Sequence, residues 1–255
     1  MDIFSAVIIG AVEGFTEFLP ISSTGHMIVV SKFLGLKQDE ALKAYEVIIQ
    51  FAAILAVLIV YKDRLSIKET KLWSNVLIAF LPLLIVGYIF KDQIKQMFDP
   101  TIVAYMFIVG GVAFLIIEYF YKEEKSKVKS IDEIRPKDAF LIGLFQLLSF
   151  IPGTSRAGST IAGGMIIGLN RKSATEFSFL LAIPVMGAVS LYDLLKHYND
   201  LAEGNITAYI VGFITAFVVA YFTIKWLLAF ISKFSFVPFG VYRILFGLFL
   251  LYYYF

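Results

Sequence analysis

Apolar residues fill eight long stretches of this 255-residue chain, and short polar segments separate most of them. A soluble domain has no place for so much apolar surface: 59% of the residues are hydrophobic, against about 45–50% in ordinary soluble domains. A helix crosses a bilayer in about 20 residues, so the sequence predicts an all-α polytopic membrane helical bundle, with residues 1–255 as one integral membrane domain. The stretches cover approximately 3–35, 45–61, 73–90, 101–121, 139–169, 174–195, 206–231 and 238–255.

The composition also excludes several kinds of protein. The formal net charge is only +2, which gives no reason to expect a nucleic-acid partner. The chain has no cysteine, so disulfides, zinc–thiolate sites and iron–sulfur clusters are excluded. No basic residue precedes the first apolar stretch, so we expect that stretch to be a lasting part of the fold and not a cleaved signal peptide.

Two of the eight stretches are interrupted by residues that break helices. LPISSTGH divides 3–35, and IPGTSRAGST divides 139–169. Proline stops a helix, and Gly, Ser and Thr favour turns and helix starts. The arm 139–151 would make about 20 Å of helix, too short for a hydrocarbon core of about 30 Å. We therefore expect two re-entrant helical hairpins and six spanning helices, the alternative being two ordinary kinked spans.

The two halves of the chain resemble each other weakly, and they do so at the two interrupted stretches. One pair of matches is offset by 132 residues and another by 130. Each half then holds one hairpin and three spans, so the second half enters the membrane from the opposite side, which predicts an inverted-topology repeat. Repeat 1 covers about 1–121 and repeat 2 about 139–255. The matching residues are Pro20 with Pro152, Ser23 with Ser155, Glu46 with Glu176 and Ala52 with Ala182.

The distribution of Lys and Arg predicts the orientation. Fourteen basic residues fall on one side of the predicted membrane and six on the other. Basic loops are enriched on the cytoplasmic side, so both termini and the mouth of the first hairpin should face outward. The larger group is 62, 64, 68, 71, 122, 125, 127, 129, 135, 137, 171, 172, 225 and 233, and the smaller is 32, 37, 43, 91, 95 and 196.

The first hairpin carries two acids. Glu13 and Glu17 lie four residues apart on one helical face, where like charges repel. Ionisable residues inside a membrane are functional candidates, and this pair needs a metal ion, a basic partner or a shared proton. Helix capping accounts for one or two of the hydroxyl groups that follow, but three beside a histidine indicate a site. These residues are Ser22, Ser23, Thr24 and His26.

The second hairpin has the features of a phosphate site. Glycines let a backbone approach a ligand closely, and the N-terminus of the following helix offers free N–H groups. Arg156 adds a planar fork of donors that suits phosphate. Close helix packing would explain the small residues, but it would not explain Arg156. The candidate residues are Gly153, Thr154, Ser155, Arg156 and Thr160.

Inverted symmetry brings both hairpin tips to the bilayer midplane. The resulting locus suits an anion, with room for a divalent cation that bridges the anion and the carboxylates. A small inorganic anion, an amino acid and a phosphorylated lipid all fit this pattern, and a lipid headgroup explains why the site lies in the membrane. Four other charged residues lie near stretch ends, where we expect them to extend to the interface: Glu46, Glu118, Lys225 and Arg243.

At these residues the sequence resembles the undecaprenyl-diphosphate phosphatase family, also called the bacitracin-resistance family. EGFTEFLPISSTGH resembles the family's Glu-xxx-Glu signature and the Ser-Ser-Thr-Gly-His run after it, and PGTSRAGST resembles the signature PGxSRSxxT. The resemblance continues through YEVIIQFAAILAVLIVYKDRL and RKSATEFSFLLAIP, so it covers essentially the whole chain. Ala157 departs from the pattern, since the family commonly has Ser there, and we leave this position out of the site.

The resemblance implies a multi-pass enzyme of the bacterial inner membrane that removes the terminal phosphate from a C55 polyprenyl diphosphate. It implies a divalent cation, Mg²⁺ or Ca²⁺, and membrane lipid as the environment, and it leaves a homodimer open. By motif match the site residues are Glu13, Glu17, Ser23, His26, Ser155, Arg156 and Thr160.

The residue types suit phosphoryl transfer, which depends mainly on positioning and charge neutralisation. We expect Ser23, His26, Glu17 and Arg156 to be catalytic and Glu13 and Glu17 to hold the metal. Ser23 could attack with His26 or Glu17 taking its proton, or else a metal-held water or His26 could attack. The main rival is a transporter, which needs no nucleophile, and a structural scaffold leaves Arg156 and the two acids unexplained. Ser22, Thr24, Gly153, Thr154, Ser155, Arg156 and Thr160 should bind the substrate.

Overall fold

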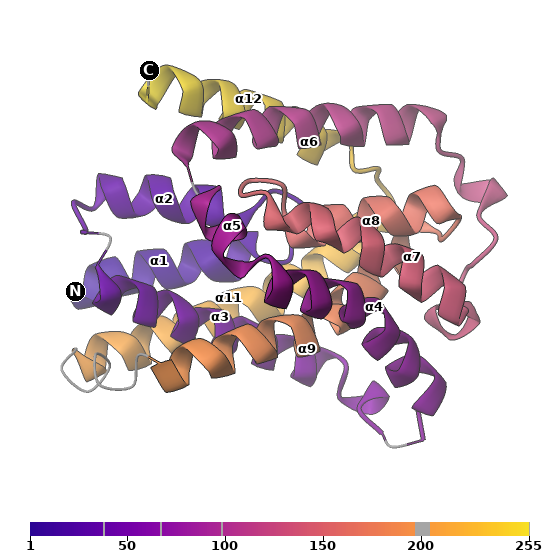
Figure 1. Ribbon diagram of the computed structural model, residues 1–255, viewed down its shortest axis with the longest axis horizontal. Coiled ribbons are helices and arrows are strands. Elements are labelled where there is room, and N and C mark those ends of the chain that lie inside the picture. The colour runs from indigo at the N-terminus through magenta and orange to yellow at the C-terminus, as the bar shows by residue number, and fades with distance from the viewer. Residues whose placement is uncertain (38, 67, 98, 197–204, 255) are drawn as a thin grey trace.

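The computed structural model describes every residue except 38, 67, 98, 197–204 and 255. The described chain folds into eleven α-helices and contains no strand, as the sequence predicts. Figure 1 shows the long helices side by side in one bundle. The helices are α1 (Ile3–Thr16), α2 (Ser23–Phe33), α3 (Glu40–Val60), α4 (Thr70–Ile89), α5 (Lys91–Gln96), α6 (Pro100–Phe120), α7 (Pro136–Gln146), α8 (Arg156–Ile167), α9 (Arg171–Lys196), α11 (Ile206–Ile231) and α12 (Val237–Tyr254).

Five of the described helices are long and apolar enough to cross a membrane: α3, α4, α6, α9 and α11. The sixth span expected from the sequence corresponds to α12, which is apolar but shorter. Large apolar side chains point outward from these helices, among them Leu81 of α4 and Val109 of α6, both about half exposed. Water would penalise such a surface, whereas lipid tails accept it. The chain is therefore a multi-pass membrane protein.

Each interrupted stretch forms two short helices joined at a tip. α1 is followed by the turn residues 17–22 and then by α2, which returns beside it (Figure 1). α7 runs through the 3-10 turn Leu147–Phe150 into a second tip and returns as α8. The breaks fall at Pro20 and Pro152, where the sequence predicts them. At about 1.5 Å per residue, none of the four arms approaches the length of α6 or α11.

Small residues let the hairpin arms lie directly on their neighbours. α1 packs along α11, and a Cβ atom added at Gly10 would lie only 2.5 Å from the carbonyl oxygen of Gly212. α7 packs along α4 in the same way, with Gly143 against the backbone of Ala79. Backbones that touch leave no space for a side chain between them. α3 packs on α9, and α6 packs on α12.

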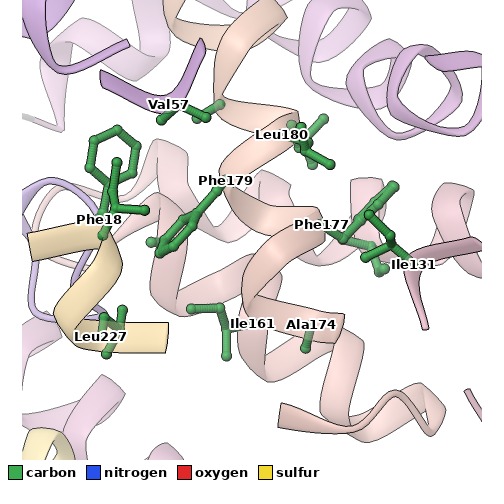
Figure 2. Close-up of a cluster of buried hydrophobic side chains, with 14 of the residues drawn as sticks. Phe18, Val57, Ile131, Ile161, Ala174, Phe177, Phe179, Leu180 and Leu227 are labelled. Atoms are coloured by element: carbon green, nitrogen blue, oxygen red, sulfur yellow. The ribbon is translucent and has the colours of Figure 1, made fainter. Parts of the chain in front are cut away.

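The largest apolar core joins the first tip to α9. Phe18, at the start of the tip, meets Phe179 of α9 edge to face, with ring centroids 5.3 Å apart (Figure 2). Both rings are fully buried, and Ile161 of α8 and Leu227 of α11 belong to the same cluster. This packing fixes the tip of the first half against helices of the second half.

Two of the charged residues expected to extend to the interface do not do so. Glu118 is buried at the end of α6, where it accepts two hydrogen bonds from Arg171, at 2.9 and 2.5 Å, and one from the backbone N–H of Phe236. The expectation for Glu118 was wrong because the start of α9 supplies a buried partner. Arg243 is the second case and is described with the site.

Candidate functional site

The two hairpin tips meet at a cavity of about 190 Å³. α3 and α9 supply the remaining walls, so the cavity lies where both halves of the chain converge. Its lining combines hydroxyl groups, one carboxylate, one amide and one guanidinium with an apolar patch from α9. The lining residues are Glu17, Ser22, Ser23, Thr24, Gln50, Ser149, Pro152, Gly153, Ser155, Arg156, Val185, Met186 and Val189.

Glu17 joins the two tips. One of its carboxylate oxygens accepts a hydrogen bond from the Ser23 hydroxyl at 2.6 Å, and the other accepts one from Arg156 Nη2 at 2.9 Å. Both members of the ion pair are about nine-tenths buried, with side chains 9% and 11% exposed. The structure therefore brings three of the four predicted catalytic residues into one hydrogen-bonded group. Of the three options for the acids, a metal ion, a basic partner or a shared proton, the structure shows a basic partner for Glu17, which is Arg156.

Arg156 is the first residue of α8, and its guanidinium is held on more than one side. Nη1 donates to the carbonyl of Ser178 at 3.0 Å, and Nη2 also lies 3.3 Å from the sulfur of Met186. Nε is buried and has no hydrogen-bond partner among the described residues. A buried donor without a partner is costly, and an anion in this cavity would supply one.

Both helices that start at the tips begin with an unusual backbone. Ser22 precedes α2 with φ 66°, and Ser155 precedes α8 with φ 75°, values that residues with a side chain rarely adopt. The Ser155 hydroxyl accepts from the Gly158 N–H at 3.0 Å and so caps α8. By backbone conformation, Ser22 of the first tip therefore corresponds to Ser155 of the second. The sequence match between the two halves had instead placed Ser23 opposite Ser155.

Of the remaining predicted residues of the second tip, one lines the cavity and two do not. Gly153 lines the cavity with φ 90°, and a Cβ atom there would lie 2.6 Å from the carbonyl oxygen of Val103, so only glycine fits. The Thr154 hydroxyl is buried and has no partner among the described residues. Thr160 lies outside the lining, and its hydroxyl donates to the carbonyl of Arg156 at 3.0 Å. The same hydroxyl lies 2.6 Å from the Ser178 hydroxyl of α9, so Thr160 joins α8 to α9, and its contact with substrate remains a prediction.

Glu13 lies one turn before Glu17 and is buried behind the cavity wall. The charges that act on it are those of the Glu17 and Glu46 carboxylates and the Arg156 guanidinium. The described residues contain no cluster of three His, Cys, Asp or Glu that could hold a metal. Glu13 and Glu17 nevertheless place two acids against one arginine, which leaves negative charge that a cation would balance. Magnesium sites commonly use one or two carboxylates and complete their shell with water and phosphate.

His26 does not face the cavity, although it follows Ser23 by one turn. Its Nδ1 lies 2.8 Å from the Ser22 carbonyl, which can only accept, so Nδ1 carries a proton. Its Nε2 lies 2.5 Å from the Tyr242 hydroxyl, and its ring stacks on Phe246 with centroids 4.4 Å apart. The ring instead borders a separate apolar cavity of about 630 Å³ between α1, α2, α11 and α12.

The sequence reasoning missed two residues near the tips. Gln50 of α3 lines the cavity, and Arg243 of α12 is fully buried beside both tips. Arg243 therefore contradicts the expectation that it extends to the interface. Each is a strongly polar residue inside an apolar stretch, a signal that already singled out Glu13, Glu17 and Arg156.

Comparison with known proteins gives a consistent result over almost the whole chain. Residues 6–249 match the family described as bacitracin resistance protein BacA. A protein of Sulfurovum sp. (strain NBC37-1) named undecaprenyl-diphosphatase is 60% identical over 98% of this chain and 99% of its own length. Proteins of the same name from Sulfurimonas denitrificans and Methanococcus aeolicus are 58% and 48% identical, each over 98% of both chains.

Proposed function

This chain belongs to the family of the bacitracin resistance protein BacA, and we propose from this that it hydrolyses undecaprenyl diphosphate to undecaprenyl phosphate and inorganic phosphate. Such a reaction returns the carrier lipid used in peptidoglycan synthesis. The observation that carries the proposal is the group formed by Ser23, Glu17 and Arg156, because it places a nucleophile, a base and a phosphate-binding fork at one cavity.

The chemistry proceeds in two displacements. Ser23 Oγ attacks the terminal phosphorus and passes its proton to Glu17, and the bond to the bridging oxygen breaks to release undecaprenyl phosphate. Water then attacks the phosphoserine, which releases inorganic phosphate and restores the hydroxyl. Arg156 and the N–H groups at the start of α8 stabilise the charge that develops on the transferred group. Direct attack by water is the alternative, and the 2.6 Å contact between Ser23 and Glu17 favours the serine. Attack by His26 is disfavoured, because its ring faces away from the cavity.

The lipid tail needs a route from the cavity to the bilayer. Val185, Met186 and Val189 of α9 form the apolar part of the lining, and Val189 is 49% exposed on the outside of the bundle. We place the first isoprene units on this wall, with the diphosphate among the hydroxyl groups of Ser22, Ser23, Thr24 and Ser155. A substrate held in this way reacts without leaving the membrane.

A divalent cation, Mg²⁺ or Ca²⁺, would be held by Glu13 and Glu17. When bound, it would neutralise charge on the diphosphate and on the two acids. Glu17 has a second task, since it orients Ser23 and the Arg156 fork. His26 holds the Ser22 carbonyl through Nδ1, so we assign it a positioning role at the first tip.

We also propose that the architecture is an inverted-topology repeat with two re-entrant hairpins. The helix contacts support it, because α1 on α11 corresponds to α7 on α4, while α3 pairs with α9 and α6 with α12. The matching backbone of Ser22 and Ser155 supports it independently. In a bacterial inner membrane both termini and the cavity mouth would then face outward, on the side with fewer basic residues.

Phosphate release from purified protein tests the proposal. In detergent, with Mg²⁺ and farnesyl diphosphate as a short-chain substrate, we expect inorganic phosphate to form at a rate that scales with enzyme. A transporter built on the same repeat would release none, since detergent removes the two compartments that transport requires. Absence of phosphate release by well-folded protein from both farnesyl and undecaprenyl diphosphate would contradict the proposal.

A further inference from the structure

Arg243 is the most deeply buried charged residue among those described, and its position is unusual. Its exposed fraction is 0%, although it lies near the middle of the apolar helix α12. A buried guanidinium is costly unless each of its five N–H groups finds an acceptor. No acid forms an ion pair with it in the described part of the chain. The residue must therefore be held by neutral acceptors.

All five acceptors are backbone carbonyl oxygens, and they come from three segments of the chain. Nη1 donates to Pro20 at 2.9 Å and to Thr154 at 3.0 Å. Nη2 donates to Gly153 at 3.0 Å and to Met106 at 3.0 Å, and Nε donates to Phe107 at 3.4 Å. One side chain thus binds the tip between α1 and α2, the tip between α7 and α8, and the middle of α6.

We propose that Arg243 is a positioning residue that holds the backbone of both tips and sets the orientation of the Ser155 N–H toward the phosphate. The inference rests on the proposed phosphatase function. A trans peptide unit is planar, with its N–H opposite to its C=O, and the described chain has no cis peptide. Binding the Thr154 carbonyl therefore turns the Ser155 N–H away from Arg243. Binding the Gly153 carbonyl fixes the preceding peptide, whose Thr154 N–H donates to the Ile151 carbonyl at 3.2 Å. Ser155 lines the cavity, so its N–H is directed by a residue that the substrate does not touch.

The five hydrogen bonds of Arg243, here called the Arg243 clamp, are needed because of the backbone conformation at the tips. Ser22 lies two residues after Pro20, and Ser155 directly follows Thr154, and both serines have positive φ. Residues held in sparsely populated conformations persist only when their surroundings impose them. Preorganised donors stabilise a transition state because they need no rearrangement when charge develops. Arg243 imposes these backbone conformations on both tips through its hydrogen bonds.

The guanidinium of Arg243 packs directly against Gly110 of α6, where a larger residue would not fit. A Cβ atom added at Gly110 of α6 would fall on Nη2 of Arg243, and it would lie 2.7 Å from Cζ. Gly110→Ala therefore displaces the guanidinium while leaving Arg243 and the cavity lining unchanged. Gly247→Ala is the matched control: it perturbs the same contact between α6 and α12, with a Cβ 2.7 Å from Ile108 Cγ1, but it does not meet the guanidinium.

The kinetic test uses Arg243→Lys, Arg243→Met, Gly110→Ala and Gly247→Ala with farnesyl diphosphate and Mg²⁺ in detergent. Loss of one preorganised donor typically costs roughly 10²–10³ in rate, so we expect kcat to fall by about 10² in the first three variants. KM should change by less than about threefold, because the affected groups act in the transition state. Gly247→Ala should keep kcat near the wild-type value. Lysine cannot copy the five-donor fork, so Arg243→Lys should fail to rescue.

Hydrogen–deuterium exchange gives a readout that does not depend on activity. Peptides covering 17–26 and 150–160 should exchange faster in Arg243→Lys and Gly110→Ala than in Gly247→Ala, at equal thermal midpoints. Unchanged exchange at both tips overturns the inference whatever the activity. Near-wild-type kcat in Arg243→Lys, or loss of kcat in Gly247→Ala equal to that in Gly110→Ala, also overturns it. If the wild-type protein releases no phosphate while tip exchange responds as expected, the proposed function fails and the clamp stands.

Discussion

Ser22 and Ser155 adopt the same strained backbone in opposite halves of the chain. Their φ angles are 66° and 75°, and each is the residue immediately before a helix. The two serines differ in one respect: Ser155 caps its helix with its hydroxyl, whereas Ser22 makes no such bond. The difference allows backbone strain to be measured separately from capping.

We expect Ser22→Gly to stabilise the protein by about 1 kcal/mol, because glycine adopts positive φ without the penalty of a side chain. For a chain of this size that corresponds to a rise in thermal midpoint of about 2–4 °C. Ser22→Ala keeps the strain and should give no rise. Ser155→Gly should gain less than Ser22→Gly, since it also removes a cap. Equal midpoints for Ser22→Gly and Ser22→Ala in one detergent would show that the backbone is not strained.

Arg156→Lys should abolish most phosphatase activity while the protein still folds. Lysine is a point charge that cannot hold two phosphate oxygens in one plane, and an arginine that stabilises transferring phosphate is worth roughly 10³–10⁵ in rate. The measurement is kcat per folded protein, with yield checked by size exclusion. Arg135→Lys is a suitable control, because the Arg135 side chain is exposed and pairs with the buried Asp138 outside the cavity. If Arg156 only balances the charge of Glu17, the lysine variant will retain near-native turnover.

Ser23→Ala and Glu17→Gln should lose similar fractions of kcat, and the double variant should lose little more. Residues that act as one unit give strongly non-additive losses, and Ser23 and Glu17 share a 2.6 Å hydrogen bond. Acid quenching during turnover should trap a phosphoserine, which mass spectrometry would locate at Ser23. Substantial activity in Ser23→Ala, together with no trapped phosphate, would favour direct attack by water.

Chelation should remove activity. EDTA in excess should abolish phosphate release, and added Mg²⁺ or Ca²⁺ should restore it, because Glu13 and Glu17 repel each other on one helical face. Glu13→Gln removes one of the two charges, so we expect it to weaken the response to Mg²⁺ and to raise the concentration needed for half-maximal rate. Full activity of wild-type protein in excess chelator would exclude the cation from the mechanism.

The orientation can be tested in whole cells because the chain has no cysteine of its own. Lys37→Cys should react with a membrane-impermeant maleimide in intact cells. Lys68→Cys and Lys129→Cys lie on the side with more basic residues and should react only after lysis. The opposite pattern would place the cavity mouth on the cytoplasmic side.

The sequence was informative wherever one residue type has one local consequence. Pro20 and Pro152 break helices in any surroundings, so the positions of both tips were predictable. Glu17 and Arg156 are opposite charges in an apolar environment, and their proximity follows from the cost of leaving either alone. The sequence therefore predicted the breaks, the long helices and a locus that holds both Glu17 and Arg156, whereas a basic partner was only one of three options for the acids.

Residues whose role depends on packing between distant helices were not predictable. Ser23 and His26 are three apart in a helix and should share a face, yet Tyr242 and Phe246 of α12 bind the histidine ring away from the cavity. An arginine inside an apolar stretch, such as Arg243, can either extend to the membrane interface or be buried with its N–H groups bound to carbonyl oxygens. The second is possible only because Gly110, on another helix, leaves the space.

Arg243 follows every cavity residue in the sequence, so it is also the last of these residues to be synthesised. Every residue that lines the cavity lies between Glu17 and Val189, so the ribosome has made the whole lining before Arg243 exists. Glu13 and Glu17 are synthesised first, Arg156 follows more than a hundred residues later, and Arg243 comes only with α12. A nascent or truncated chain without α12 therefore carries all the chemical groups of the cavity but not their alignment. If the proposed function is correct, we expect hydrolysis of the carrier lipid to begin only after α12 has joined the bundle.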